Sequence, residues 1–154
     1  MILIFLNTSA QGKYSGDFKK IIGTKYYTEK DIPLLDNYTY FGGSIISDSI
    51  DSYYLSLEVF RKGKTAIIIL SKLIDKETKK RSIIEVLKII DVPKTYEIRT
   101  FGCTSKNSNP DDKIVAVINS SSRKKIKFIK ESYILKDIRF EKINAKTIKC
   151  IDEI

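Results

Sequence analysis

The chain contains no histidine, and that absence excludes more chemistry than any other feature of its composition. Without imidazole there is no histidine general base, no Ser-His-Asp or Cys-His catalytic arrangement, and no zinc site with histidine ligands. Only two cysteines occur in 154 residues, too few for a structural zinc knuckle or an iron–sulfur cluster. We expect no catalytic residue, no metal ligand and no cofactor, and therefore a protein that is not an enzyme.

Long apolar runs are missing as well. Even the longer runs, such as Met1–Leu6 and Ala66–Leu70, have only the length of a strand, whereas about 18 apolar residues are needed to span a bilayer. Met1–Leu6 resembles the end of a signal-peptide core and Thr8–Ala10 a cleavage site, but the apolar run is short and no basic residue precedes it. We predict a buried strand over Ile2–Asn7, no membrane insertion and a cytoplasmic protein. A gene that begins upstream would make the protein periplasmic or secreted.

Motifs that bind phosphate or metal are absent too. The sequence has no G-x-x-x-x-G-K-[ST], no G-x-G-x-x-G and no EF-hand loop. The pair Gly42-Gly43 favours a β-bulge over an anion site, because paired glycines within a strand usually mark a bend. Asp111 and Asp112 follow Pro110 in a predicted turn, where aspartate is expected for structural reasons, so they indicate no cation site.

Positive charge is in excess and unevenly distributed. The formal net charge is +9. Residues 1–60 hold 5 basic and 7 acidic side chains, a balance of −2, whereas residues 61–154 hold 23 basic and 12 acidic, a balance of +11. The segment Arg123–Lys149 alone carries 10 basic and 3 acidic residues, or +7. Such a field favours nucleic acid, an anionic membrane surface or an acidic protein as partner; a solvated lysine-rich surface is the structural alternative.

A β-hairpin is the clearest local pattern. In Ser52–Phe60 apolar and polar side chains alternate with a period of two, and Arg61–Lys64 supplies a turn with glycine where a positive φ is tolerated. Thr65–Leu73 follows, apolar on both faces through Ile67–Leu70. The pattern predicts that this hairpin lies at the centre of a sheet with Ile67–Leu70 buried.

One helix is predicted over about residues 76–91. Asp75 is a suitable N-cap, and Ser82 with Glu85 forms a second potential capping box. Apolar residues then recur at helical spacing, at Ile83, Leu87 and Ile90. Pro93 is expected to end the helix, because proline cannot continue its hydrogen bonds.

Only strand patterns follow the helix. They lie at Tyr96–Cys103, Lys113–Asn119, Ile126–Lys136 with a break near Glu131, Ile138–Ile143 and Thr147–Ile151. An earlier strand is predicted at Tyr38–Ile46. Connected as hairpins, with the helix packed on one face, these elements give an α+β fold with a mainly antiparallel sheet. No linker or repeat interrupts the chain, so we predict a single domain over residues 1–154.

The two cysteines, Cys103 and Cys150, each end a predicted strand. A bond between them would close a loop of 48 residues and stabilise the fold by about 4 kcal/mol in the chain-entropy description. Two unrelated buried thiols are the alternative. We predict that the two cysteines lie within disulfide reach, and we leave the bond itself open.

Tyrosine and arginine anchor many protein interfaces, and a field of one sign speeds the encounter with a partner of the opposite sign. We therefore predict a protein-contact surface built from tyrosines of the N-terminal part and from basic residues of the C-terminal part. These residues are Tyr26, Tyr27, Tyr38, Tyr40, Tyr54, Arg123, Lys124, Lys125 and Lys127.

In the C-terminal third, Gly102-Cys103 is followed by a polar loop and then by Asp112–Val117, Phe140–Ile143 and Ile148–Glu153. This order resembles that of small bacterial immunity proteins of toxin–immunity systems, including contact-dependent growth inhibition. The resemblance carries over no functional residue. It implies a protein-binding toxin inhibitor that neutralises a cognate bacterial toxin domain. The alternative is a basic nucleic-acid-binding protein, or a histidine-free ribonuclease that uses Lys, Arg and Tyr.

Overall fold

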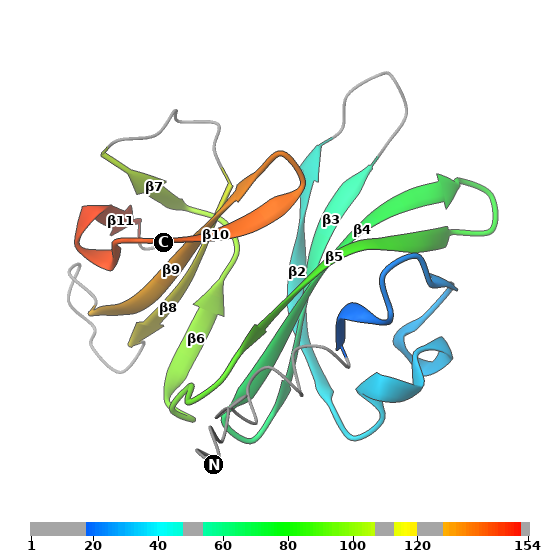
Figure 1. The fold of residues 1–154 in the computed structure, drawn as a ribbon, viewed down its shortest axis with the longest axis horizontal. Helices are drawn as coiled ribbons and strands as arrows, with labels where there is room; N and C mark the ends of the chain where they lie inside the picture. The colour runs from blue at the N-terminus through cyan, green and yellow to red at the C-terminus, as the bar shows by residue number, and fades with distance from the viewer. Residues whose placement is uncertain (1–17, 48–53, 107–112, 120–127, 152–154) are drawn as a thin grey trace, which may run out of the picture.

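A computed structural model describes residues 18–47, 54–106, 113–119 and 128–151 of the chain (Figure 1). Most of these residues lie in antiparallel strands. The strands form a five-stranded sheet, called sheet A below, a four-stranded sheet, called sheet B, and a two-stranded ribbon. No helix among the described residues is long and apolar enough to cross a membrane.

Sheet A has the strand order β1-β5-β4-β3-β2. Its strands are β1 (Lys25–Tyr26), β2 (Thr39–Ser47), β3 (Leu55–Lys62), β4 (Thr65–Asp75) and β5 (Lys80–Ile89). Two short 3-10 helices, η1 (Glu29–Asp31) and η2 (Pro33–Leu35), lie between β1 and β2. All of sheet A therefore comes from the first 90 or so residues.

Sheet B has the strand order β10-β9-β8-β6, and the ribbon pairs β11 with β7. Their strands are β6 (Tyr96–Arg99), β7 (Cys103–Ser105), β8 (Lys113–Asn119), β9 (Ile129–Lys136), β10 (Arg139–Ile143) and β11 (Ile148–Cys150). A third 3-10 helix, η3 (Ala145–Thr147), precedes β11. Figure 1 shows sheet B and the ribbon on one side of the molecule and sheet A on the other.

The predicted central hairpin is confirmed. β3 and β4 pair in continuous register from Leu55 opposite Lys72 to Lys62 opposite Thr65, and Gly63 in the turn has φ +57. β4 is the middle strand of sheet A, and Ile67–Leu70 are completely buried. The strand is apolar on both sides because both faces of sheet A are covered.

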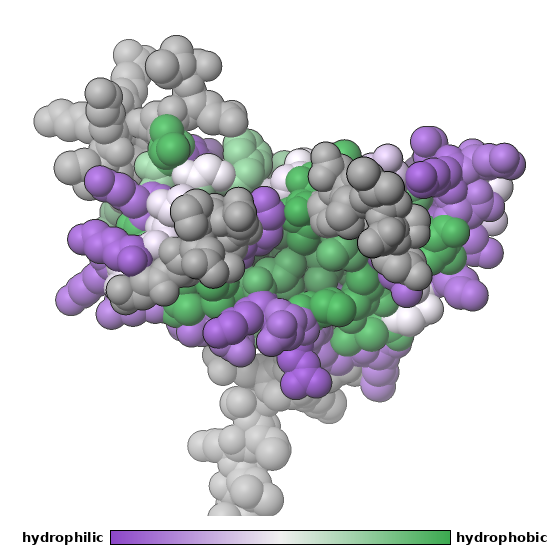
Figure 2. Space-filling model, turned by 90° about the horizontal axis from the view of Figure 1, so that it is seen from above, coloured by the Kyte–Doolittle hydropathy of each residue, from purple (hydrophilic) through white to green (hydrophobic). Residues whose placement is uncertain are grey.

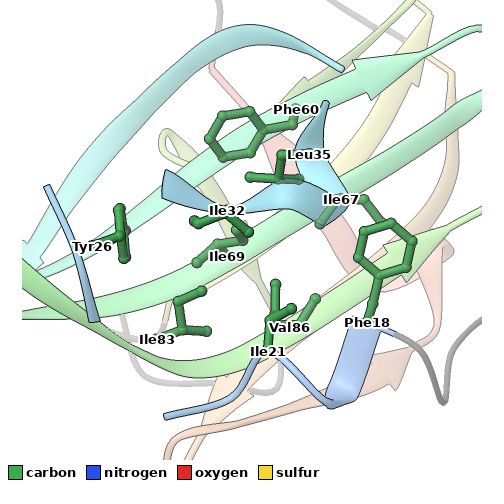
Figure 3. Close-up of a cluster of buried hydrophobic side chains, with 10 residues drawn as sticks. All are labelled: Phe18, Ile21, Tyr26, Ile32, Leu35, Phe60, Ile67, Ile69, Ile83 and Val86. Carbon is green, nitrogen blue, oxygen red and sulfur yellow. The ribbon is translucent and has the colours of Figure 1, made fainter. Parts of the chain in front are cut away.

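Three clusters of buried apolar residues divide the molecule into layers. The first lies between sheet A and the segment around β1, η1 and η2, where Ile32 and Leu35 face Ile69 (Figure 3). The second lies between sheets A and B and includes Ile68 and Val115. The third lies between sheet B and the ribbon. Each sheet is thus covered on both faces.

The predicted helix over residues 76–91 is wrong, and with it the α+β class. The chain there forms the turn that follows β4 and the whole of β5, and no helix of seven or more residues occurs in the described part. Asp75 does cap backbone amides, but in a hairpin turn: its Oδ1 accepts hydrogen bonds from the amides of Glu77 (2.9 Å) and Thr78 (3.4 Å). The fold is an antiparallel all-β arrangement.

A β-bulge explains why β5 reads as a helix. Along β4, Leu70 lies opposite Glu85 and the next residue, Ser71, opposite Ile83, so Ile84 is an extra residue. The extra residue breaks the two-residue period of the strand. As a result, apolar side chains on the two faces of sheet A are spaced three and four residues apart along the sequence, which is also the spacing of apolar residues on one face of a helix.

Other strand predictions fit to different degrees. β8 has the predicted bounds, and β2 has the predicted irregularity at its glycine pair, between Tyr40 and Gly43. Tyr96–Cys103 is not one strand, because the chain turns at Gly102, with φ +75, and starts β7. The strand predicted over Ile2–Asn7 lies outside the described residues, as do Asp111 and Asp112.

A buried arginine connects sheet A to residues 90–95, the linker that leads from β5 to β6 in sheet B. The guanidinium of Arg61 donates hydrogen bonds to the carbonyl oxygens of Tyr96 (2.6 Å), Pro93 (3.1 Å) and Val92 (3.4 Å). Val92 itself is fully buried between the two sheets. Arg61 was expected in the turn Arg61–Lys64; in the structure it belongs to β3 and is 8% exposed.

Candidate functional surfaces

The five tyrosines predicted to contact a partner do not share one surface. Tyr26 is 2% exposed and belongs to the first core cluster, so it is not available to a partner. Tyr38 is half-buried, with its ring centroid 5.8 Å from that of Phe18. Tyr27 and Tyr40 are each 52% exposed. Tyr54 is 36% exposed and immediately precedes β3.

The basic residues predicted to complete this surface, Arg123, Lys124, Lys125 and Lys127, lie outside the described residues. The structure therefore says nothing of where they stand relative to the tyrosines. Among the described residues, one group of positive side chains lies on the β4–β5 hairpin, close to two of the tyrosines.

A polar cluster lies on sheet A beside the first core cluster. The Tyr26 hydroxyl donates to Glu58 Oε1 (3.0 Å), and Arg81 Nε is 3.7 Å from the same oxygen. Arg81 also donates from Nε to Ser71 Oγ (2.8 Å) and from a terminal nitrogen to Ser56 Oγ (2.5 Å). The cluster joins side chains from β1, β3, β4 and β5.

Burial sets the protonation behaviour of this cluster. Loss of solvent raises the pKa of the Glu58 carboxyl above its ordinary value, although the Tyr26 hydroxyl and the Arg81 charge act in the opposite direction. Burial and the nearby Glu58 carboxylate also raise the pKa of Tyr26. The arrangement holds a carboxyl, a phenol and a guanidinium together, and it fixes Arg81 at the end of the sheet.

Two lysine–tyrosine pairs stand at that same end of sheet A. The Lys76 ammonium lies 5.3 Å from the ring centroid of Tyr54, and the Lys80 ammonium 5.6 Å from that of Tyr27. The register places Tyr26 opposite Arg81 and Leu73 opposite Arg81, so Tyr27 and Tyr54 flank the β4–β5 hairpin. We call Tyr27, Tyr54, Lys76, Lys80 and Arg81 the hairpin-end surface.

Charge at the hairpin-end surface is positive. Residues 75–81 contain four basic and two acidic side chains, a balance of +2. Figure 2 shows hydrophilic residues gathered over this end of the molecule, away from the apolar side chains in the middle of the same view. Sequence reasoning missed this surface because it predicted a helix over residues 76–91, where the structure has the hairpin that brings the lysines close to the tyrosines.

A shallow hollow of about 190 Å³ lies between β2 and the corner that joins β6 to β7. Ser44 Oγ donates across it to Thr100 Oγ1 (2.9 Å). Phe101 and Ile151, at its rim, are 47% and 69% exposed. Among the residues that line the hollow, Lys113 is the one ionisable side chain, so the lining holds no acid–base pair.

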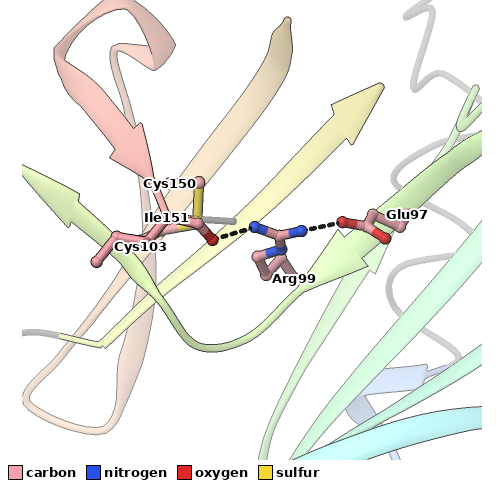
Figure 4. The surroundings of a disulfide bond; sticks show 5 residues. All are labelled: Glu97, Arg99, Cys103, Cys150 and Ile151. Carbon is pink, nitrogen blue, oxygen red and sulfur yellow. Dashed lines mark hydrogen bonds and ion pairs between the residues drawn. A yellow bond between two sulfur atoms is a disulfide. The ribbon is translucent and has the colours of Figure 1, made fainter. Parts of the chain in front are cut away.

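The disulfide lies next to this hollow. Cys103 and Cys150 are bonded, face each other in the register of the ribbon, and have Cα atoms 4.0 Å apart. The Arg99 guanidinium donates to the Ile151 carbonyl (2.7 Å) and pairs with Glu97 (2.6 Å), as Figure 4 shows. The bond closes the covalent loop considered from the sequence.

Comparison with known proteins adds no relative to this description. No family model, no curated protein and no solved structure matches the chain. Within the described ranges, no three acidic or cysteine side chains are grouped so that they could hold a metal ion. The functional argument therefore depends on the surfaces above.

Proposed function

We propose that this chain is a non-enzymatic protein-binding protein, and more specifically an immunity protein that neutralises a cognate bacterial toxin domain. The observation that carries the proposal is the hairpin-end surface, where two exposed tyrosines are each paired with a lysine. Tyrosine supplies large contact area at low entropic cost, which is why it anchors interfaces. The toxin-inhibitor form of the proposal rests on the resemblance of the C-terminal third.

The charge of the surface specifies the partner. Lysine ammonium groups held over aromatic rings present a positive field beside an apolar face. A complementary partner carries carboxylates around an apolar centre, since opposite fields speed the encounter and apolar contact supplies the affinity. We therefore expect the toxin domain to use an acidic patch for this contact.

The disulfide favours the periplasmic or secreted alternative for the compartment over the cytoplasmic one. Structural disulfides form and persist where the surroundings are oxidising, and cytosolic thiols are kept reduced. A toxin inhibitor in such a compartment would meet its target outside the cytoplasm.

The test is co-expression with the toxin domains encoded by the genes beside this one. Growth should be restored, and the two proteins should elute together from a sizing column. Tyr54→Ala and Lys80→Glu should weaken the complex at least tenfold. Lys62→Glu is the matched control, because Lys62 is an exposed lysine at the opposite end of β3. Equal effects of the two lysine reversals, or no complex with any neighbouring toxin domain, would contradict the proposal.

A basic nucleic-acid-binding protein or histidine-free ribonuclease is the second candidate. The hairpin-end surface also places tyrosines, which can stack on bases, next to lysines, which can contact phosphates. For cleavage, Glu58 beside Arg81 and Tyr26 would be the acid–base group. Steep loss of binding to a single-stranded RNA oligonucleotide with salt, or RNA cleavage abolished by Glu58→Gln, would favour this candidate.

A further inference from the structure

The ribbon of β7 and β11 is joined to its surroundings mainly at one side. β11 pairs with β7 over three residue pairs, and in the described part of the chain it has no second neighbouring strand. Two backbone hydrogen bonds extend the pairing, from Lys106 to Thr147 (3.1 Å) and from Ile151 to Gly102 (2.8 Å). A strand held by so few bonds at a sheet edge separates readily unless it is covalently tied.

The ribbon covers apolar surface that belongs to sheet B. Ile148 on β11 is 8% exposed and lies in the third core cluster with Ile114, Ile118 and Ile134. These sheet B residues are buried beneath the ribbon rather than between the two sheets. Separation of β11 would therefore uncover an apolar face of sheet B and leave the core between the sheets intact.

The two sulfur atoms differ in access. Cys103 is 6% exposed, whereas Cys150 is only half-buried. Thiol–disulfide exchange needs a thiolate to approach one sulfur along the bond, so the more accessible sulfur is attacked. Figure 4 shows the bond at the end of the ribbon, where Cys150 leads directly into Ile151 at the rim of the hollow.

We propose that the Cys103–Cys150 bond is an exchange site for dithiol reductants and that its reduction releases β11 from sheet B. One thiolate of the dithiol attacks Cys150 Sγ, which forms a mixed disulfide and expels Cys103 as a thiolate. The second thiol of the reductant then displaces Cys150. The dithiol ends as a disulfide, and the protein gains two electrons and, after protonation, two thiols. The proposal is independent of the proposed function, because it involves none of the hairpin-end residues.

Hydrogen exchange measured by mass spectrometry tests the release on the intact chain, with and without dithiothreitol. Reduction should speed exchange at least tenfold in peptides covering β7 and residues 144–151. Peptides covering Ile67–Leu70 should exchange far more slowly than the ribbon both before and after reduction, although the lower global stability speeds their exchange as well. Cys103→Ala/Cys150→Ala should show the fast pattern without reductant, whereas Ile148→Ala with the bond intact should keep residues 149–151 slow.

Three results would overturn the proposal. Unchanged exchange in the ribbon after complete reduction would show that the non-covalent contacts alone hold β11. Exchange of Ile67–Leu70 at the same rate as the ribbon after reduction would show global unfolding rather than local release. With the monothiol 2-mercaptoethanol, the mixed disulfide should be found on Cys150; its presence mainly on Cys103 would refute the direction of attack.

Discussion

Replacement of Arg61 by lysine is expected to weaken the connection between the two sheets. The guanidinium reaches three carbonyl oxygens, those of Val92 and Pro93 in the linker and that of Tyr96 at the start of β6. The lysine of Arg61→Lys keeps the positive charge, but its single ammonium nitrogen cannot donate hydrogen bonds to all three carbonyl oxygens. It should therefore lose two of the three contacts.

The magnitude follows from those two contacts. A hydrogen bond from a charged donor contributes about 1.5 kcal/mol at the lower end of its range, so Arg61→Lys should lower the free energy of unfolding by about 3 kcal/mol. The carbonyls that lose their donor lie beside Val92, which is fully buried, so water replaces the donor poorly.

Urea unfolding followed by circular dichroism measures this loss. Arg139→Lys is the matched control, because Arg139 is exposed on the edge strand β10, and its replacement should change the free energy by less than about 0.5 kcal/mol. A loss below about 1 kcal/mol for Arg61→Lys, with an unchanged denaturant slope, would refute the claim that these contacts secure the linker.

Three further predictions concern stability. Cys103→Ala/Cys150→Ala should lower the free energy of unfolding by about 4 kcal/mol through loss of the covalent loop, and equal urea midpoints of variant and wild type would contradict it. Burial raises the pKa of the Glu58 carboxyl, so the native protein binds this proton more tightly than the unfolded chain does. The stability of the wild type relative to Glu58→Gln should therefore fall as the pH rises from the unfolded pKa of Glu58 toward neutrality. A stability difference that does not change with pH would refute this. Gly43→Ala should lower the free energy of unfolding by about 2 kcal/mol and so lower the melting temperature, because the new Cβ would stand 2.4 Å from the Leu57 carbonyl oxygen. An unchanged melting temperature would show that β2 shifts freely.

The parts of the fold that sequence reasoning captured are those where one physical rule acts alone. β3, β4 and β8 have apolar runs or strict alternation, bounded by turn residues, and their positions were predicted closely. The same reasoning failed at β5. There the bulge at Ile84 changes the phase of the strand, so Ile83 and Val86 enter the first core cluster while Ile84 and Leu87 contact the second.

The chemistry of β5 did carry a signal against a helix. Ile83, Ile84, Val86 and Ile89 are β-branched, and such side chains favour strands over helices. The capping pattern at Asp75 outweighed that signal, because an aspartate that caps the first turn of a helix and one that caps a hairpin turn make the same hydrogen bonds to backbone amides. Local capping therefore could not separate the two structures.

That one error also determined which surface could be found. In a helix over 76–91, Lys76 and Lys80 would lie one turn apart on a single face. In the hairpin Lys76 begins the turn and Lys80 begins β5, and each reaches a different tyrosine, Tyr54 just before β3 and Tyr27 just after β1. The positive charge of the contact surface was expected from residues 123–149, because the charge count pointed to that segment. The strand register brings lysine and tyrosine together. It includes the pairing of β1 with β5, which places Tyr26 opposite Arg81, and residue patterns along the chain do not contain a pairing between segments so far apart in the sequence.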